Sequence, residues 1–230
     1  MGRMHSRRIA LNVGVVVLAF AALTATPAAA QEFTPGAPGL GDPYFPLAGN
    51  GGYDVGHYAL DFSYDPSTRQ LDGTATISAT ATQDLSRFDL DLRGFDIESL
   101  SVSDTPATFT RDGQELVITP AAGLVAGTAF TVVVGYQGVP SVVTDPDGSI
   151  EGWVPTADGA FVVGEPQGSP AWYPANDNPR DKATYDFTIT VPADLTVMAN
   201  GVLDSRTTVG DQTTFVWRAI SPMAPYLATA

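Results

Sequence analysis

The chain has 230 residues and a formal charge of −14 at pH 7, from 11 Lys and Arg against 25 Asp and Glu. It contains no cysteine, which excludes a disulfide framework, a thiolate zinc site and a cysteine nucleophile. The acidic charge repels phosphate backbones and argues against nucleic acid as a partner. With 44% hydrophobic and 16% charged residues, the composition is that of a folded globular protein.

Residues 1–30 have the three parts of a secretory signal peptide. An apolar run over residues 9–23 follows a basic start, and Ala28-Ala29-Ala30 fits a cleavage site before Gln31. The alternative is a retained membrane anchor, but the run is shorter than the roughly 20 residues that a spanning helix needs. We therefore predict a secreted, extracellular protein that begins at Gln31 and has no stable membrane anchor.

A mature chain that begins at Gln31 keeps one histidine, His57. A catalytic zinc site usually takes two or three histidines. A Ser-His-Asp hydrolase would have to use His57, which stands in a strand-like stretch with no nucleophile motif nearby. We interpret His57 as a strand residue that faces solvent or a neighbour, and we expect no metal or catalytic residue in this chain by itself.

The first half of the mature chain has the alternation of short strands. Residues 31–52 are rich in Gly and Pro and are predicted to form an extended leader. From Tyr53 onward apolar residues alternate with polar ones, as in Tyr58-Ala59-Leu60-Asp61-Phe62. Strands are predicted at residues 58–64, 71–82, 88–92, 100–102, 116–118 and 130–136 and at Phe109. Asp65-Pro66-Ser67 and Asp112-Gly113 predict turns between them.

The second half continues this pattern after a predicted loop over residues 138–159. Strands are predicted at residues 161–163, 185–191 and 215–220, with a turn at Asn200-Gly201. No stretch after the signal peptide has a helical period over ten or more residues. Eight to twelve short strands joined by turns predict an all-β fold, an antiparallel β-sandwich.

One short segment is similar to the start of a calcium loop. Asp145-Pro146-Asp147-Gly148-Ser149 contains the D-x-D-G pattern, but it lacks the further ligand before the glycine and the glutamate at the twelfth position. We interpret it as a turn, with metal binding as the minor alternative.

Residues 164–179 differ from the strands around them and carry a family resemblance. Tyr173-Pro174 and Asp177-Asn178-Pro179 stand just before Lys182-Ala183-Thr184-Tyr185. This order resembles the N-terminal domain of zinc aminopeptidases of the aminopeptidase N type, which are gluzincins. In that family a Phe-Pro-x-x-Asp-x-Pro element precedes a Lys-Ala-x-Tyr/Phe strand. Residues 58–62, 71–75 and 90–92 resemble the opening strands of the same domain.

The resemblance covers residues 53–227 and implies a saddle-like β-sandwich. Complete family members continue into a thermolysin-like catalytic domain with a His-Glu-x-x-His zinc motif, which this chain does not contain. Residues 228–230 are therefore interpreted as the start of a missing catalytic domain, and zinc is expected only in the complete protein. The resemblance implies a truncated part of an aminopeptidase that releases N-terminal residues from peptides.

The resemblance also implies a substrate-binding residue. In the family a Glu or Gln ahead of the Asp-x-Pro element holds the free α-amino group of the peptide, and the family spacing from Asp177 places it at Glu165. Gln167 is the second choice, because Val162-Val163-Gly164 replaces the usual Thr-Gln-x and Pro166 replaces Ala. A carboxylate that faces an ammonium group makes a charge-assisted hydrogen bond. The alternative is that Glu165 is a solvent-exposed acid on a loop with no role in binding.

A second hypothesis is a stand-alone secreted β-sandwich module that binds peptide or carbohydrate. Trp153, Trp172 and Tyr173 would form its aromatic platform, although aromatic residues next to proline are more often packed into the core. A downstream His-Glu-x-x-His sequence would favour the enzyme, whereas a natural end near Ala230 would favour the module.

Overall fold

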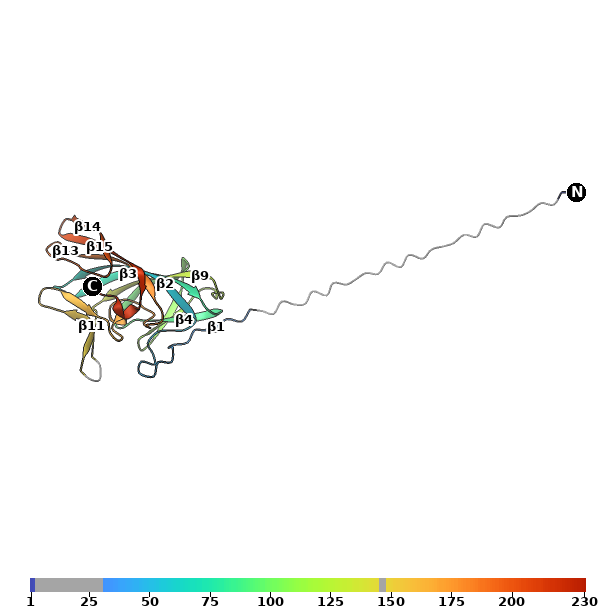
Figure 1. Cartoon of the computed structure of the whole chain (residues 1–230), viewed down its shortest axis with the longest axis horizontal. Coiled ribbons are helices and arrows are strands. Elements are labelled where there is room, and N and C mark those ends of the chain that lie inside the picture. Colours follow the sequence, from blue (N-terminus) through green and yellow to red (C-terminus); the bar gives the residue numbers. More distant parts are fainter. Residues whose placement is uncertain (3–30, 145–147) are drawn as a thin grey trace. The chain divides into compact units, whose positions relative to one another are not determined.

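The largest sheet is built around a hairpin of β2 (Tyr53–Asp65) and β3 (Gln70–Ala81). Buried positions alternate with exposed or half-buried ones along both strands, so one face of the hairpin is turned to the core. Figure 1 shows the computed structural model, which describes residues 1–2, 31–144 and 148–230. Within it, Gln31–Ala230 form one compact unit.

Eight strands form this sheet, in the order β14-β15-β13-β2-β3-β9-β5-β6. Neighbouring strands are antiparallel, except that β2 and β13 run parallel. The further members are β5 (Asp96–Val102), β6 (Thr105–Pro106), β9 (Ala129–Gly138), β13 (Ala183–Pro192), β14 (Val202–Val209) and β15 (Gln212–Met223).

Two smaller sheets complete the fold. Four strands have the order β1-β4-β8-β7, namely β1 (Thr34–Pro35), β4 (Leu85–Asp91), β7 (Thr108–Asp112) and β8 (Glu115–Thr119). Three more have the order β10-β11-β12, namely β10 (Val142–Thr144), β11 (Ile150–Pro155) and β12 (Ala160–Val163). The helical elements among the described residues are the 3-10 turns η1 (Ser169–Ala171) and η2 (Pro225–Leu227).

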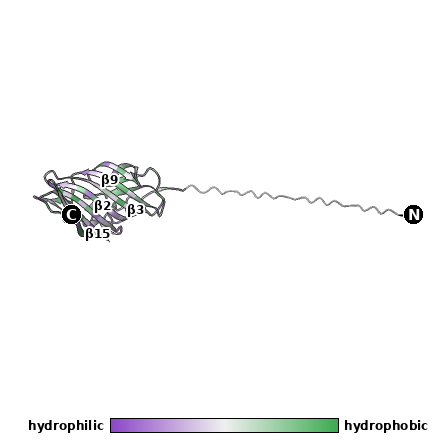
Figure 2. Cartoon of the chain, turned by 90° about the horizontal axis from the view of Figure 1, so that it is seen from above, coloured by the Kyte–Doolittle hydropathy of each residue, from purple (hydrophilic) through white to green (hydrophobic). Residues whose placement is uncertain are grey.

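The core lies between the large sheet and the four-stranded sheet. The ring of Phe88 on β4 lies 5.5 Å from that of Tyr53 on β2 and 5.3 Å from that of Phe130 on β9, centroid to centroid. All three side chains are buried. Figure 2 shows hydrophobic and hydrophilic residues mixed along the strands, as expected where each strand has one buried face. The predicted all-β sandwich is thus confirmed.

Residues 31–52, the predicted leader, lie against the sandwich. β1 pairs in parallel with β4, and the Thr82 backbone N–H donates to the Gly52 carbonyl at 2.8 Å. Near the end of the segment, the Gly49 backbone N–H donates to Asp91 Oδ2 at 3.1 Å. Most of the segment has no regular secondary structure, as its Gly and Pro content predicts.

Three sequence predictions about strands are wrong. The loop predicted over residues 138–159 contains β10 and β11, which are short and begin among Pro and Gly residues. β14 was not predicted, because every residue in it is exposed and the sequence shows no apolar alternation there. The described residues contain fifteen strands rather than eight to twelve, two of them only two residues long.

Two sequence predictions concern residues that the structure does not describe. The signal peptide lies outside the described residues apart from Met1 and Gly2, and so do residues 145–147 of the calcium-like segment. Among the described residues, no helix has the length and apolar character needed to cross a membrane.

Candidate functional site

Glu165 lies at the tip of a tight turn between β12 and η1. Residues 164–168, here called the Glu165 turn, are closed by a hydrogen bond from the Gly168 N–H to the Gly164 carbonyl, 2.8 Å long. Glu165 and Pro166 are exposed, and the peptide bond that joins them is cis. The carboxylate of Glu165 is therefore presented to solvent from a short, closed loop.

Both ends of the Glu165 turn pack so closely that they need glycine. A Cβ on Gly164 would lie 2.1 Å from the Tyr226 carbonyl oxygen of η2. A Cβ on Gly168 would lie 2.3 Å from the Val163 carbonyl oxygen and 2.7 Å from the Gly152 nitrogen of β11. Real Cβ atoms do not approach other atoms this closely, so the turn is seated directly on β11 and η2.

Gln167, the second candidate, is occupied by contacts within the domain. Its backbone N–H donates to Glu151 Oε2 at 2.8 Å. Its side-chain oxygen accepts a hydrogen bond from Arg93 Nη2 at 3.2 Å, and the same Arg93 nitrogen donates to Gln114 Oε1 at 2.9 Å. Of the two candidates, Glu165 is the exposed one, whereas Gln167 is half-buried.

In the Asp-Asn-Pro element, Asp177 and Asn178 are buried, whereas Pro179 is exposed. The Asp177 backbone N–H donates to Asp91 Oδ2 at 2.9 Å, and the Asn176 backbone N–H donates to the Tyr58 hydroxyl at 2.9 Å. Burial, followed by the nearby carboxylates of Asp91 and Glu151, raises the pKa of Asp177 well above its ordinary value. Asn176 and Asp177 therefore join β2 and β4 inside the domain, and the Asp177 side chain is not available at the surface.

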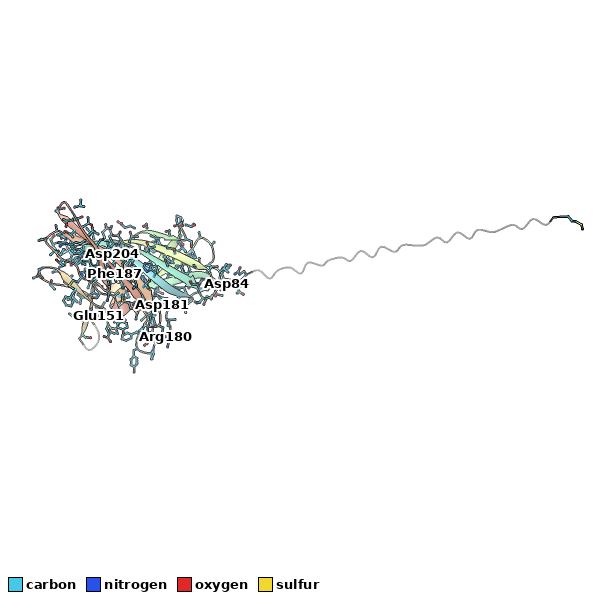
Figure 3. All side chains as sticks on the ribbon, turned by 45° about the horizontal axis from the view of Figure 1, so that its top comes forward. Asp84, Glu151, Arg180, Asp181, Phe187 and Asp204 are labelled. Carbon is cyan, nitrogen blue, oxygen red and sulfur yellow. The ribbon has the colours of Figure 1, made fainter. Side chains whose placement is uncertain are left out.

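The predicted aromatic platform is wrong. Trp153 is 5% exposed, and Trp172 and Tyr173 are fully buried. The Trp172 ring centroid lies 5.9 Å from those of Phe62 and Trp153 and 4.5 Å from that of Tyr173. These rings form the core under β2 and β13, including Phe187, which is labelled in Figure 3. Burying large aromatic rings stabilises the core, and these three rings are therefore not available as a binding surface.

His57 has a neighbour on the adjacent strand. Its Nδ1 lies 2.8 Å from Thr184 Oγ1, and its Nε2 lies 3.9 Å from Asp186 Oδ2, both on β13. Among the described residues, no group of three or more His, Cys, Asp or Glu side chains is arranged to hold a metal ion. The donor set of this part of the chain therefore does not fit a zinc site.

An apolar hollow of about 290 Å³ opens between β12 and the segment that follows β13. Phe161, Leu195, Met198 and Ala230 are among the residues that line it. Phe161 and Met198 are exposed, at 46% and 73%. The hollow adjoins the Glu165 turn along the chain, because β12 ends at Val163.

Sequence reasoning missed Glu151 and Arg93, which both contact the Glu165 turn. Glu151 stands inside the loop predicted over residues 138–159, where an isolated acidic residue is expected to be exposed to solvent. It lies instead on β11, where Figure 3 labels it. Its side chain is buried, with 1% of the residue exposed. No local pattern around either residue indicates a contact with Gln167, because the contact depends on how distant segments meet.

Solved structures with a similar fold are zinc metallopeptidases. A variant of a two-domain M1 zinc metallopeptidase bound to L-arginine is 29% identical, with a TM-score of 0.78. The M1 zinc metallopeptidase from Deinococcus radiodurans is 28% identical, also with a TM-score of 0.78. A variant of the Deinococcus radiodurans protein bound to a Tyr-Ser-Ala substrate is 29% identical, with a TM-score of 0.78. No curated protein matches the chain.

Each of these comparisons covers 83% of this chain and 44% of the solved chain, so the chain spans less than half the length of its solved relatives. The family model of the Peptidase M1 N-terminal domain matches residues 55–227, which runs from β2 to the end of η2. The match covers well over half of the chain, and the fold agrees with the solved relatives. The chain belongs to the family of Peptidase M1 N-terminal domains.

Proposed function

We propose that this chain is the N-terminal, substrate-anchoring domain of a secreted zinc metalloaminopeptidase that releases N-terminal residues from peptides. Membership of the Peptidase M1 N-terminal domain family supports the proposal, as do solved relatives that hold an amino acid or a tripeptide. The observation that carries it is the exposed carboxylate of Glu165 on a turn whose ends are seated on β11 and η2.

Glu165 would bind the free α-ammonium group of the peptide. A carboxylate and an ammonium group form a charge-assisted hydrogen bond, which is stronger than a neutral one. A peptide with a blocked N-terminus would leave the carboxylate unpaired once the site is closed from water, which is costly. The residue therefore selects substrates with a free N-terminus.

Zinc belongs to the missing catalytic domain in this proposal. The described residues provide no metal site, and His57 is hydrogen-bonded to Thr184. When bound in the complete protein, zinc would activate water for attack on the first peptide bond. The residues of this chain would contribute binding and orientation only.

The catalytic domain is the proposed partner of the apolar hollow. Phe161 and Met198 at its rim and Leu227 on η2 are exposed hydrophobic residues, and apolar surface of this kind marks interaction sites. Phe161 of β12 lines the hollow, and β12 ends at Val163, directly before the Glu165 turn. Gly164, at the start of the Glu165 turn, lies against Tyr226 of η2, so a domain that packs on η2 would also lie close to the turn.

Substitution of Glu165 in the longer enzyme tests the proposal. Hydrogen bonds to charged groups contribute about 1.5–3 kcal/mol, so Glu165→Ala should lower kcat/KM by roughly 10- to 100-fold, mainly through KM. Glu165→Gln should be milder, because an amide oxygen still accepts a hydrogen bond. Glu98→Ala, which removes an exposed acid on β5, is the control and should leave the kinetics unchanged.

The same series separates the two candidates. If Glu165→Ala leaves the kinetics unchanged while Gln167→Ala lowers kcat/KM, the substrate-binding residue is Gln167. If neither substitution changes KM, the substrate-anchoring function of the domain is wrong.

A further inference from the structure

The side chain of Glu151 has a location that stability alone does not explain. It is 1% exposed on β11, and its carboxylate lies near the buried Asp177, whose pKa it helps to raise. Two acids in one buried region repel each other, and taking a carboxylate out of water is costly. A buried carboxyl group of this kind is weak evidence for stability, and in some proteins such a group specifies a particular arrangement of the chain.

The arrangement that Glu151 specifies is that of the Glu165 turn. Glu151 Oε2 accepts the hydrogen bond from the backbone N–H of Gln167, two residues after Glu165, at 2.8 Å. This acceptor is a carboxyl oxygen shielded from water, and a hydrogen bond in such surroundings is stronger than the same bond in water. The contact joins β11 to the turn directly, without passing through a flexible side chain on the turn.

Arg93 holds the same turn from the other side. Its Nη2 donates to the Gln167 side-chain oxygen and to Gln114 Oε1, and its backbone N–H donates to the Pro170 carbonyl at 2.8 Å. Its positive charge also lowers the pKa of Asp177, opposing the effect of Glu151. Gln167 is thus held at its backbone by Glu151 of β11 and at its side chain by Arg93, which lies two residues after the end of β4.

The close contact between Gly168 and Gly152 fixes the position of the Glu165 turn on β11. Gly152 directly follows Glu151, and a Cβ on Gly168 would lie 2.7 Å from the Gly152 nitrogen. The turn therefore has little room to shift along β11 while the Glu151 contact is made. A shift of about 1 Å in a substrate-positioning group is enough to cost roughly 100-fold in rate.

We propose that Glu151 is a positioning residue for substrate binding: its buried carboxylate fixes the Gln167 amide and thereby sets where the Glu165 carboxylate meets the ammonium group of the peptide. This inference rests on the proposed substrate-anchoring function of Glu165. It assigns to Glu151 no contact with the substrate itself.

The first test measures the turn in the 230-residue chain, with no substrate. Amide hydrogen exchange of Gln167, followed by NMR, should become about ten times faster or more in Glu151→Ala, because the amide loses its acceptor. Glu151→Gln should give a smaller increase in the exchange rate, since its amide oxygen still accepts a hydrogen bond. This variant replaces Glu151→Ala in the test if Glu151→Ala does not fold. Glu98→Gln on β5 is the matched control and should leave Gln167 unchanged. The proposal fails if the Gln167 amide accelerates no more than the amides of β3.

The second test uses the longer enzyme and a double-mutant cycle. Glu151→Gln should raise KM for peptides by about 3- to 10-fold when Glu165 is present and should have no further effect in the Glu165→Ala background. An equal effect in both backgrounds would show that Glu151 acts independently of Glu165 and would overturn the proposal. No effect of either Glu165→Ala or Gln167→Ala would instead overturn the proposed function, so the two failures are distinguishable.

Discussion

Buried carboxyl groups face each other across β4 and β8. Asp91 and Glu115 are paired residues of these antiparallel strands, and both are at most 3% exposed. Burial raises the pKa of Asp91 to about 7, although the N–H groups of Gly49 and Asp177 favour its charged form. Burial and the carboxylates of Asp91 and Asp89 raise the pKa of Glu115 to about 8.

These groups predict that the domain is less stable at higher pH. The folded state holds their protons more tightly than the unfolded chain, whose ordinary pKa values are 3.8 for Asp and 4.5 for Glu. The free energy of unfolding should therefore fall as pH rises from about 4 to about 8. Hydrogen bonds lower the pKa values of Asp42 and Asp65, so these two groups change the free energy of unfolding only below about pH 4. Urea unfolding followed by tryptophan fluorescence at pH 5 and pH 8 measures the effect.

Glu115→Gln isolates the contribution of one carboxyl group. The substitution keeps the shape and removes the titration, so it should stabilise the domain at pH 8 by about 1–3 kcal/mol and have less effect at pH 5. Glu98→Gln, at an exposed position, should behave as the unchanged protein. Equal stability of Glu115→Gln and the unchanged protein at pH 8 would contradict this account.

At the scale of elements, the segment of residues 31–52 is held to the sandwich by backbone contacts that need glycine. Gly49 has a φ of +73° and donates its N–H to Asp91. A Cβ there would lie 2.5 Å from Cβ of Asn178. Since φ > 0 and the lack of space both oppose a side chain, the end of the segment adopts one path over β4.

Gly49→Ala should therefore destabilise the domain by more than about 1 kcal/mol. Gly94→Ala is a matched control, because Gly94 has a similar φ of +76° but nothing within 4 Å of its Cβ position. The difference in melting temperature between the two variants reports the crowding of the new Cβ against Asn178 and Asn176. Equal losses would mean that backbone strain, and not crowding, accounts for the whole effect.

At the scale of the whole molecule, the proposed role of the described part of the chain is to bind and orient the substrate. This described part has a closed core, an apolar hollow, the exposed Glu165 and no arrangement of side chains for a metal ion. We expect the purified 230-residue chain not to hydrolyse aminoacyl anilides, with or without added zinc, because a catalytic zinc needs three protein ligands. Turnover that depends on zinc and co-purifies with the chain would contradict this expectation.

The exported form of the protein should begin at Gln31. A basic start, an apolar run and Ala28-Ala29-Ala30 together predict cleavage by signal peptidase. Intact-mass measurement of the exported protein checks the start. A mass that includes Met1 would contradict the prediction of a cleaved signal peptide.

Alternating burial explains why two central strands of the large sheet were predicted from the sequence and its exposed edge strand β14 was not. β2 and β13 have regular alternation, since each presents one face to the core, and both were predicted. β14 is exposed throughout and was missed, because its strand conformation depends on pairing with β15 and leaves no hydrophobic period. β11 was missed because it is short and stands within a stretch that reads as loop.

The sequence by itself determined the all-β class, most strands of the large sheet and the family resemblance, because alternation and motif order are local properties of the chain. Only the tertiary structure decided that Trp153, Trp172 and Tyr173 are core residues and that Glu151 reaches Gln167. It also decided that Gln167 is held by Arg93 while Glu165 is exposed. Burial and contacts between distant segments depend on how the sheets pack, and the local pattern of residues does not contain that information.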